Sequence, residues 1–151
     1  MRARFLALGL AASILVLALA AAGCSSQETA SPAQTNAPAE TAGYVTVDVQ
    51  PAYEALTSDQ DAQLLDVREP EEWAETGVPQ GAVLIPLAEV ESRAAAELAP
   101  DRSVYVICRS GNRSRTASEI LAQLGYTEVY NVDGGVTAWL DAAQPVESYT
   151  P

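Results

Sequence analysis

The chain has 151 residues, a length that suits one domain with a substantial core. Its 20 acidic residues outweigh 8 basic ones, and the formal net charge of −12 argues against nucleic-acid binding, which needs a basic face. The chain contains no histidine, so catalysis by a Ser–His or Cys–His pair is excluded. We expect no metal site and no cofactor, since histidine is also the commonest neutral metal ligand.

The first residues have the pattern of an export signal. Arg2 and Arg4 precede an uncharged run over residues 5–22, and small residues then lead to Cys24. The ending AAGC resembles the lipobox of bacterial lipoproteins, with Ala21 where leucine is usual. This resemblance implies a signal peptide over 1–23, acylation of Cys24 and anchoring at the extracytoplasmic face of a membrane. A retained membrane helix and ordinary secretion stay open as alternatives.

Residues 24–43 are expected to form a flexible tether. After Cys24 they contain no aliphatic residue larger than alanine and are rich in Ser, Thr, Pro and Gln. Such a composition cannot bury enough apolar surface to offset the entropy of ordering. Random-coil scaling gives the tether a typical reach of roughly 25 Å. The folded domain is therefore predicted over residues 44–151.

From Tyr44 on, short β-rich runs alternate with segments of helical spacing. The runs predicted as strands cover residues 44–49, 63–67, 82–86, 103–107 and 128–132. The helical patterns begin near Pro51, in an acidic turn that Gly77 closes, at Leu87, ahead of Ala117 and at Val136. Gly125 is the expected stop of the fourth helix. Alternating strands and helices indicate an α/β fold with a parallel sheet covered on both faces.

Cys108 directly follows the fourth predicted strand, at the edge where parallel sheets bind ligands. A lone cysteine is more often a small buried apolar residue than a nucleophile. Here, however, an exported chain whose Cys24 is acylated leaves Cys108 without a disulfide partner. A tight loop and a helix N-terminus follow it, and Arg109, Arg113 and Arg115 add positive charge. These features favour an anion and predict a lowered thiol pKa.

Four ordered segments resemble the rhodanese-like (sulfurtransferase) family over residues 44–141. They are LLDVREPEEW (64–73), GVPQGAVLIP (77–86), CRSGNRS (108–114) and GYTEVYNVDGGVTAWL (125–140). Val78 departs from the pattern, because the family commonly has a histidine there, but that histidine takes no part in the chemistry. The resemblance implies a rhodanese-like domain with a central five-stranded parallel sheet flanked by helices on both faces.

The resemblance also implies a reaction. The Cys108 thiolate would take the outer sulfur of a small anionic donor such as thiosulfate and hold it as a persulfide, while sulfite leaves. Cyanide or a thiol, free or on an unidentified protein partner, would then remove the sulfur. Splitting one transfer into two steps is nucleophilic catalysis, and a thiolate of lowered pKa needs no separate base.

The expected site residues come from the loop and from the strand end before it. Cys108 is the predicted nucleophile, and the predicted substrate-binding residues are Arg109, Ser110, Gly111, Asn112, Arg113 and Ser114. Arg109 and Arg113 are expected to bind the anionic donor, Arg113 in a bidentate mode. Asp66 and Arg68 match supporting positions of the family. Their pairing either braces the loop or is an ordinary surface ion pair of small energetic weight.

Other functions use a similar loop. Cysteine phosphatases resemble Cys-x5-Arg, whereas here four residues separate Cys108 from Arg113. The related mercaptopyruvate enzymes have a smaller, less basic loop, so the arginines favour a small dianion such as thiosulfate. A thiol–disulfide oxidoreductase is disfavoured because no CxxC motif is present. The alternative that stays open is a carrier module that holds a persulfide or an anion for a partner without turnover of its own.

Overall fold

The computed structural model describes residues 40–41 and 43–151 of the chain. The predicted signal peptide, the predicted acylation site Cys24 and the predicted tether as far as residue 39 lie outside the described residues. Within the described part of the chain, no helix has both the length and the apolar character needed to cross a bilayer.

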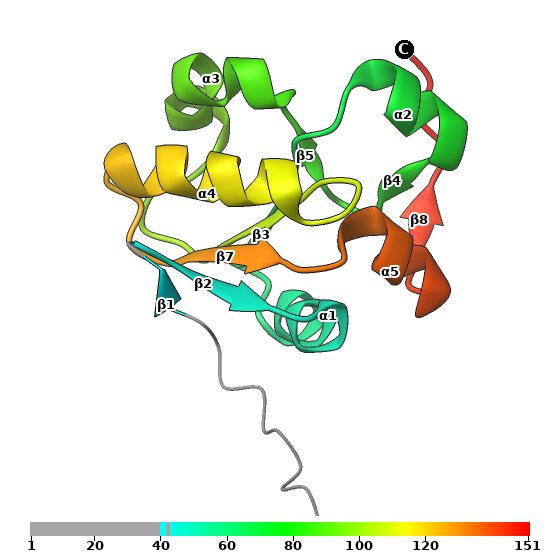
Figure 1. Ribbon diagram of the computed structural model, residues 1–151, viewed down its shortest axis with the longest axis horizontal. Coiled ribbons are helices and arrows are strands. Elements are labelled where there is room, and N and C mark those ends of the chain that lie inside the picture. Colours follow the sequence, from blue (N-terminus) through cyan, green and yellow to red (C-terminus); the bar gives the residue numbers. More distant parts are fainter. Residues whose placement is uncertain (1–39, 42) are drawn as a thin grey trace, which may run out of the picture. The chain divides into compact units, whose positions relative to one another are not determined.

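A mixed six-stranded sheet forms the centre of the domain (Figure 1). Its strands in spatial order are β1 (Glu40–Thr41), β2 (Tyr44–Val47), β7 (Val129–Val132), β6 (Val104–Ile107), β3 (Gln63–Asp66) and β5 (Val83–Leu84). The five strands from β2 to β5 are parallel, and β1 pairs with β2 in the antiparallel sense. The predicted α/β fold with a five-stranded parallel sheet is thus confirmed. The pairing of β1 extends the sheet into the segment assigned to the tether.

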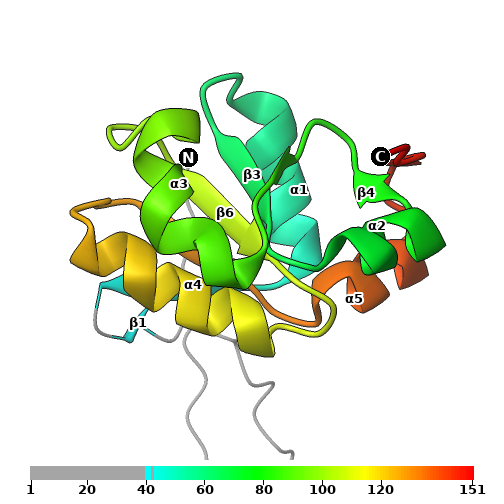
Figure 2. The same ribbon diagram turned by 90° about the horizontal axis from the view of Figure 1, so that it is seen from above.

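Helices cover both faces of this sheet (Figures 1 and 2). They are α1 (Val49–Ser58), α2 (Pro70–Thr76), α3 (Val90–Glu97), α4 (Asn112–Gln123) and α5 (Gly135–Asp141), and a 3₁₀ turn, η1 (Leu87–Glu89), precedes α3. One core cluster packs α3 and α4 on the sheet, and a second packs α1 and α5 on its other face. The central strand β6 is buried along its whole length, as expected for a strand covered on both faces.

Helix α2 begins and ends where its sequence predicts. Pro70 occupies the first turn, where its missing N–H costs nothing, and Glu69 and Glu72 form a reciprocal capping box. Gly77 ends the helix at φ 75°, in the left-handed region that glycine tolerates best. The backbone N–H of Glu69 donates to Oε2 of Glu72 at 3.2 Å, so the first turn of α2 fixes the Glu72 carboxylate.

The C-terminal segment packs against α2. Strand β8 (Val146–Glu147) pairs with β4 (Val78–Pro79) in a separate two-stranded sheet, which the sequence did not predict. Beyond it, the ring of Tyr149 contacts that of Trp73 edge-to-face, with 5.3 Å between centroids. This contact covers the buried Trp73 of α2.

The carboxyl ends of the parallel strands place the predicted site residues at one edge of the sheet. Asp66 ends β3 and pairs in register with Ile107, the last residue of β6. Val67 N–H donates to the Ile107 carbonyl at 2.9 Å, so the chain that leads to Arg68 runs beside the chain that leads to Cys108. The edge predicted from topology therefore brings two distant sequence segments together.

Candidate functional site

The Cys108 loop joins the end of β6 to the start of α4. Cys108 is only 1% exposed. Gly111 stands immediately before α4 with φ 96°, and a Cβ there would lie 3.0 Å from Oδ1 of Asp133. Glycine therefore serves two needs at this position, the left-handed backbone and the close approach to the Asp133 turn. The curve that results directs N–H groups of the loop toward the sulfur.

Hydrogen-bond donors from the loop converge on the Cys108 sulfur. Gly111 N–H donates to Sγ at 3.2 Å, and the Ser114 hydroxyl lies 3.4 Å from it. Burial raises the pKa of the Cys108 thiol, but the Ser114 hydroxyl and the backbone N–H groups of Ser114, Ser110 and Gly111 outweigh burial and leave the pKa below its usual value. These donors stabilise the thiolate.

Ser114 also belongs to a buried polar chain. Its hydroxyl lies 2.7 Å from Oδ1 of Asn131 on β7, and the Asn131 amide nitrogen lies 3.4 Å from Oγ1 of Thr46 on β2. Ser114 and Asn131 are fully buried. A hydroxyl has a single proton, so Ser114 donates either to the sulfur or to Asn131 at one time. The orientation of the Asn131 amide thus bears on the hydrogen bonding of Cys108.

Helix α5 fixes the start of the loop. The backbone N–H groups of Val136 and Thr137 donate to the carbonyls of Cys108 and Arg109 at 2.8 and 3.1 Å. Gly135 has φ 57°, and a Cβ there would collide with the Cys108 carbonyl oxygen and the Arg109 carbonyl group. The Gly-Gly turn therefore lets α5 approach the nucleophile closely enough to hold its backbone.

Asp66 and Arg68 form a buried ion pair, with Nη2 of Arg68 2.7 Å from Oδ2 of Asp66 and side chains that are 0% and 2% exposed, respectively. Arg68 Nε also donates to both carboxylate oxygens. Its remaining N–H groups reach Oγ1 of Thr76 at 2.7 Å and the carbonyl of Gly77 at 2.8 Å. The pair is therefore no surface ion pair: it ties the end of β3 to the end of α2.

Arg113 makes a second ion pair, with Glu72 of α2. Its two η nitrogens donate to the two carboxylate oxygens, each at 2.7 Å. The hydrogen bonds from Arg113 lower the pKa of Glu72, and those to Glu72 raise the pKa of Arg113. Arg113 was predicted to bind the donor in a bidentate mode, but in the structure its bidentate partner is Glu72.

Arg109 lines a cavity of about 180 Å³ between α2 and α5. The cavity is bounded by Arg68, Glu72, Glu75, Thr76, Arg109, Val136, Thr137, Leu140 and Asp141. Over residues 43–151, the Arg109 side chain makes no ion pair. The side chains of Ser110 and Asn112 are exposed at the rim of the loop, and Arg115 is exposed on α4.

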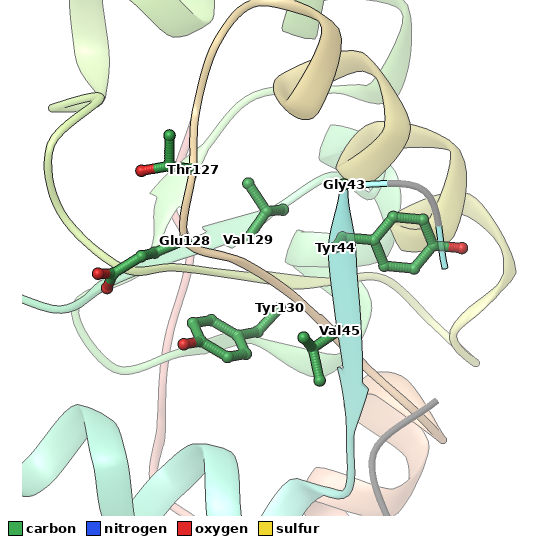
Figure 3. Close-up of a pocket in the computed structure, with 7 residues that line it drawn as sticks. All are labelled: Gly43, Tyr44, Val45, Thr127, Glu128, Val129 and Tyr130. Atoms are coloured by element: carbon green, nitrogen blue, oxygen red, sulfur yellow. The ribbon is translucent and has the colours of Figure 1, made fainter. Parts of the chain in front are cut away.

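A second cavity, of about 250 Å³, lies at the opposite edge of the sheet. Figure 3 shows its lining at the beginnings of β2 and β7, among them Tyr44, Val45, Val129 and Tyr130. It contains none of the predicted site residues. Among the residues the structure describes, no group of three or more His, Cys, Asp or Glu side chains is arranged to hold a metal ion.

The family model for the rhodanese-like domain matches residues 48–142, which include the whole Cys108 loop and the buried Asp66–Arg68 pair. The chain belongs to the rhodanese-like family. The match spans most of the described domain, and it ends just beyond α5, the helix that holds the backbone of Cys108.

Known proteins of this family include sulfurtransferases. The chain is 35% identical over 100 residues to a sulfurtransferase of Allochromatium vinosum, covering 66% of this chain and 92% of that one. It is 46% identical over 72 residues to the thiosulfate sulfurtransferase PspE of Escherichia coli, covering 46% and 67%. The chain spans from 23% to 96% of the length of the curated relatives it matches, so several of these are longer proteins.

A solved structure supports the rhodanese-like fold. The rhodanese-related protein of Thermoplasma volcanium is 34% identical, with a TM-score of 0.61 over 69% of this chain and 98% of that one. Sulfur transfer is thus the chemistry that the rhodanese-like relatives indicate in general.

Sequence reasoning missed two polar residues of this site, Glu72 and Asn131. Glu72 is one of three glutamates in the EPEEW segment, and only its capping-box spacing from Glu69 distinguishes it. Asn131 gave a clearer signal, because an asparagine inside a buried β-strand needs hydrogen-bond partners.

Proposed function

We propose that this chain is a membrane-tethered sulfurtransferase of the extracytoplasmic face. It would move sulfane sulfur from thiosulfate or a similar small donor to a thiol or cyanide through a persulfide on Cys108. The observation that carries the proposal is the group of hydrogen-bond donors around the buried Cys108 sulfur. Donors that stabilise a thiolate also suit the terminal sulfur of a persulfide, which is anionic as well.

The two steps of the proposed sulfur transfer need no cofactor. The Cys108 thiolate attacks the outer sulfur of thiosulfate, a new S–S bond forms, and the old S–S bond breaks as sulfite leaves with its electron pair. An acceptor thiolate or cyanide then attacks the outer persulfide sulfur and restores the Cys108 thiolate. The proposed membrane anchoring rests on the sequence pattern of residues 1–24.

The experiment that tests the proposal detects the persulfide on Cys108 and its removal by cyanide. The chain is incubated with thiosulfate, excess donor is removed, and trypsin then releases the peptide 103–109 by cleavage after Arg102 and Arg109. In mass spectrometry we expect this peptide to be heavier by one sulfur atom, bound to Cys108. Addition of cyanide should remove this mass and release thiocyanate at a rate that matches steady-state turnover. A stable adduct that cyanide does not discharge would favour the carrier alternative, and the absence of any adduct would refute the proposed reaction.

A further inference from the structure

The net charge of the cavity beside the Cys108 loop is less positive than the number of arginines in that loop suggests. The cavity that Arg109 lines contains the carboxylates of Glu75 and Asp141, which form no ion pair within residues 43–151, and that of Glu72, which is paired with Arg113. The guanidiniums that line it are those of Arg109 and Arg68. The charge of Arg68 is already balanced by buried Asp66. Of the arginines that line this cavity, Arg109 alone lacks an ion-pair partner within residues 43–151. A doubly charged anion therefore meets little net attraction there.

Glu72 also neutralises Arg113, so Arg113 adds no unpaired positive charge near the loop. The Arg113 and Glu72 side chains are 32% and 20% exposed, and their two 2.7 Å hydrogen bonds use both η nitrogens on one edge of the guanidinium. That edge is one of those that match two oxygens of a sulfonate or a sulfite. Because the carboxylate of Glu72 occupies it and cancels its charge, a donor can use the edge only by displacing Glu72.

We infer that Glu72 sets the charge preference of the donor site, and that the site favours donors with one negative charge over the thiosulfate dianion. This inference rests on the proposed sulfur transfer. An alkanethiosulfonate, R–SO₂–S⁻, is the matched donor with one charge fewer. The Cys108 thiolate would form an S–S bond to its outer sulfur, and the sulfinate would leave with the electron pair of the broken S–S bond. The step is otherwise the same as with thiosulfate.

The capping box makes glutamine the appropriate substitution. In Glu72→Gln the side-chain oxygen can still accept the N–H of Glu69, so the first turn of α2 keeps its cap. The substitution removes the charge opposite Arg113. Glu71→Gln is the matched control, since Glu71 is exposed in the same turn of the same helix and does not line the cavity. Both variants change the net charge of the chain equally.

The test compares kcat/KM for thiosulfate and for methanethiosulfonate in the full chain. The unmodified chain should favour methanethiosulfonate. Glu72→Gln should raise kcat/KM for thiosulfate about tenfold and change the value for methanethiosulfonate much less, because an unmasked cation attracts the dianion more strongly. Glu71→Gln should leave the ratio of the two values unchanged.

A binding measurement distinguishes the inferred charge preference from the proposed sulfur transfer. In Cys108→Ala, which cannot react, calorimetry with thiosulfate and methanethiosulfonate should still show that Glu72→Gln selectively tightens thiosulfate binding. A chain that binds in this way but transfers no sulfur would refute the proposed reaction and support the charge preference. An equal effect of Glu72→Gln on both donors, or an effect no larger than that of Glu71→Gln, would overturn the charge preference and reduce Glu72 to a structural contact.

Discussion

Replacement of Cys108 by serine should lower sulfur transfer from thiosulfate to cyanide by roughly a thousandfold or more. The serine hydroxyl fits the space of the thiol, and the donors from Gly111 and Ser114 remain. A hydroxyl, however, stays protonated at neutral pH and forms no persulfide. The measurement is thiocyanate release over time by the full chain, with a thermal unfolding curve of each variant to show that both are folded.

Cys24→Ser is the matched control for this prediction. It replaces the other cysteine of the chain and lies outside the domain that the family model matches. This variant should keep its turnover when it is assayed in solution. Turnover that survives in Cys108→Ser, or that is lost in Cys24→Ser, would assign the chemistry to a different residue.

Replacement of Arg68 by methionine should destabilise the domain by about 3–5 kcal/mol. Methionine fills a similar volume but leaves the Asp66 carboxylate buried without its partner. It also removes the hydrogen bonds to Thr76 and Gly77 that secure the end of α2. A typical domain has only 5–15 kcal/mol of stability, so this loss is large. Urea unfolding followed by tryptophan fluorescence measures it.

Arg93→Met supplies the comparison for the buried pair. Arg93 forms ion pairs with Glu89 and Glu97 on the surface of α3, with side chains 35–51% exposed. Solvent screens such pairs, and their loss should cost less than about 1 kcal/mol. If the two substitutions cost the same, the Asp66–Arg68 pair has no structural weight beyond that of a surface contact.

The sequence predicted the central parallel sheet because short β-rich runs alternate with segments of helical spacing. The run 103–107 became the buried β6, and the run 128–132 became β7. The two-residue strands β1, β4 and β8 escaped prediction, since each is short and, unlike β5, lies in no longer β-rich run. Leu124 and Leu140 continue the apolar spacing of α4 and α5 but are 43% and 40% exposed.

The site was predictable where it depends on local sequence and unpredictable where it depends on tertiary contacts. The position of Cys108 after a strand and before a helix follows from the order of residues. The bond between Arg113 and Glu72, 41 residues apart, follows only from the packing of α2 against the start of α4. The local sequence therefore indicated a basic loop, whereas the fold pairs Arg113 of that loop with Glu72 and the nearby Arg68 with Asp66.

The hydrogen-bond donors around Cys108 matter only if they keep its sulfur ionised near neutral pH. The rate of alkylation by iodoacetamide, followed on peptide 103–109 across pH, measures this most directly. Only the thiolate reacts, so the rate should fall as pH drops through the thiol pKa. We expect an inflection below the ordinary thiol value, moved to higher pH by Ser114→Ala. Ser118→Ala, one turn further along α4 and bonded to the Ser114 carbonyl, should leave the inflection in place. An inflection at or above the ordinary value, unmoved by Ser114→Ala, would contradict the role we assign to this loop.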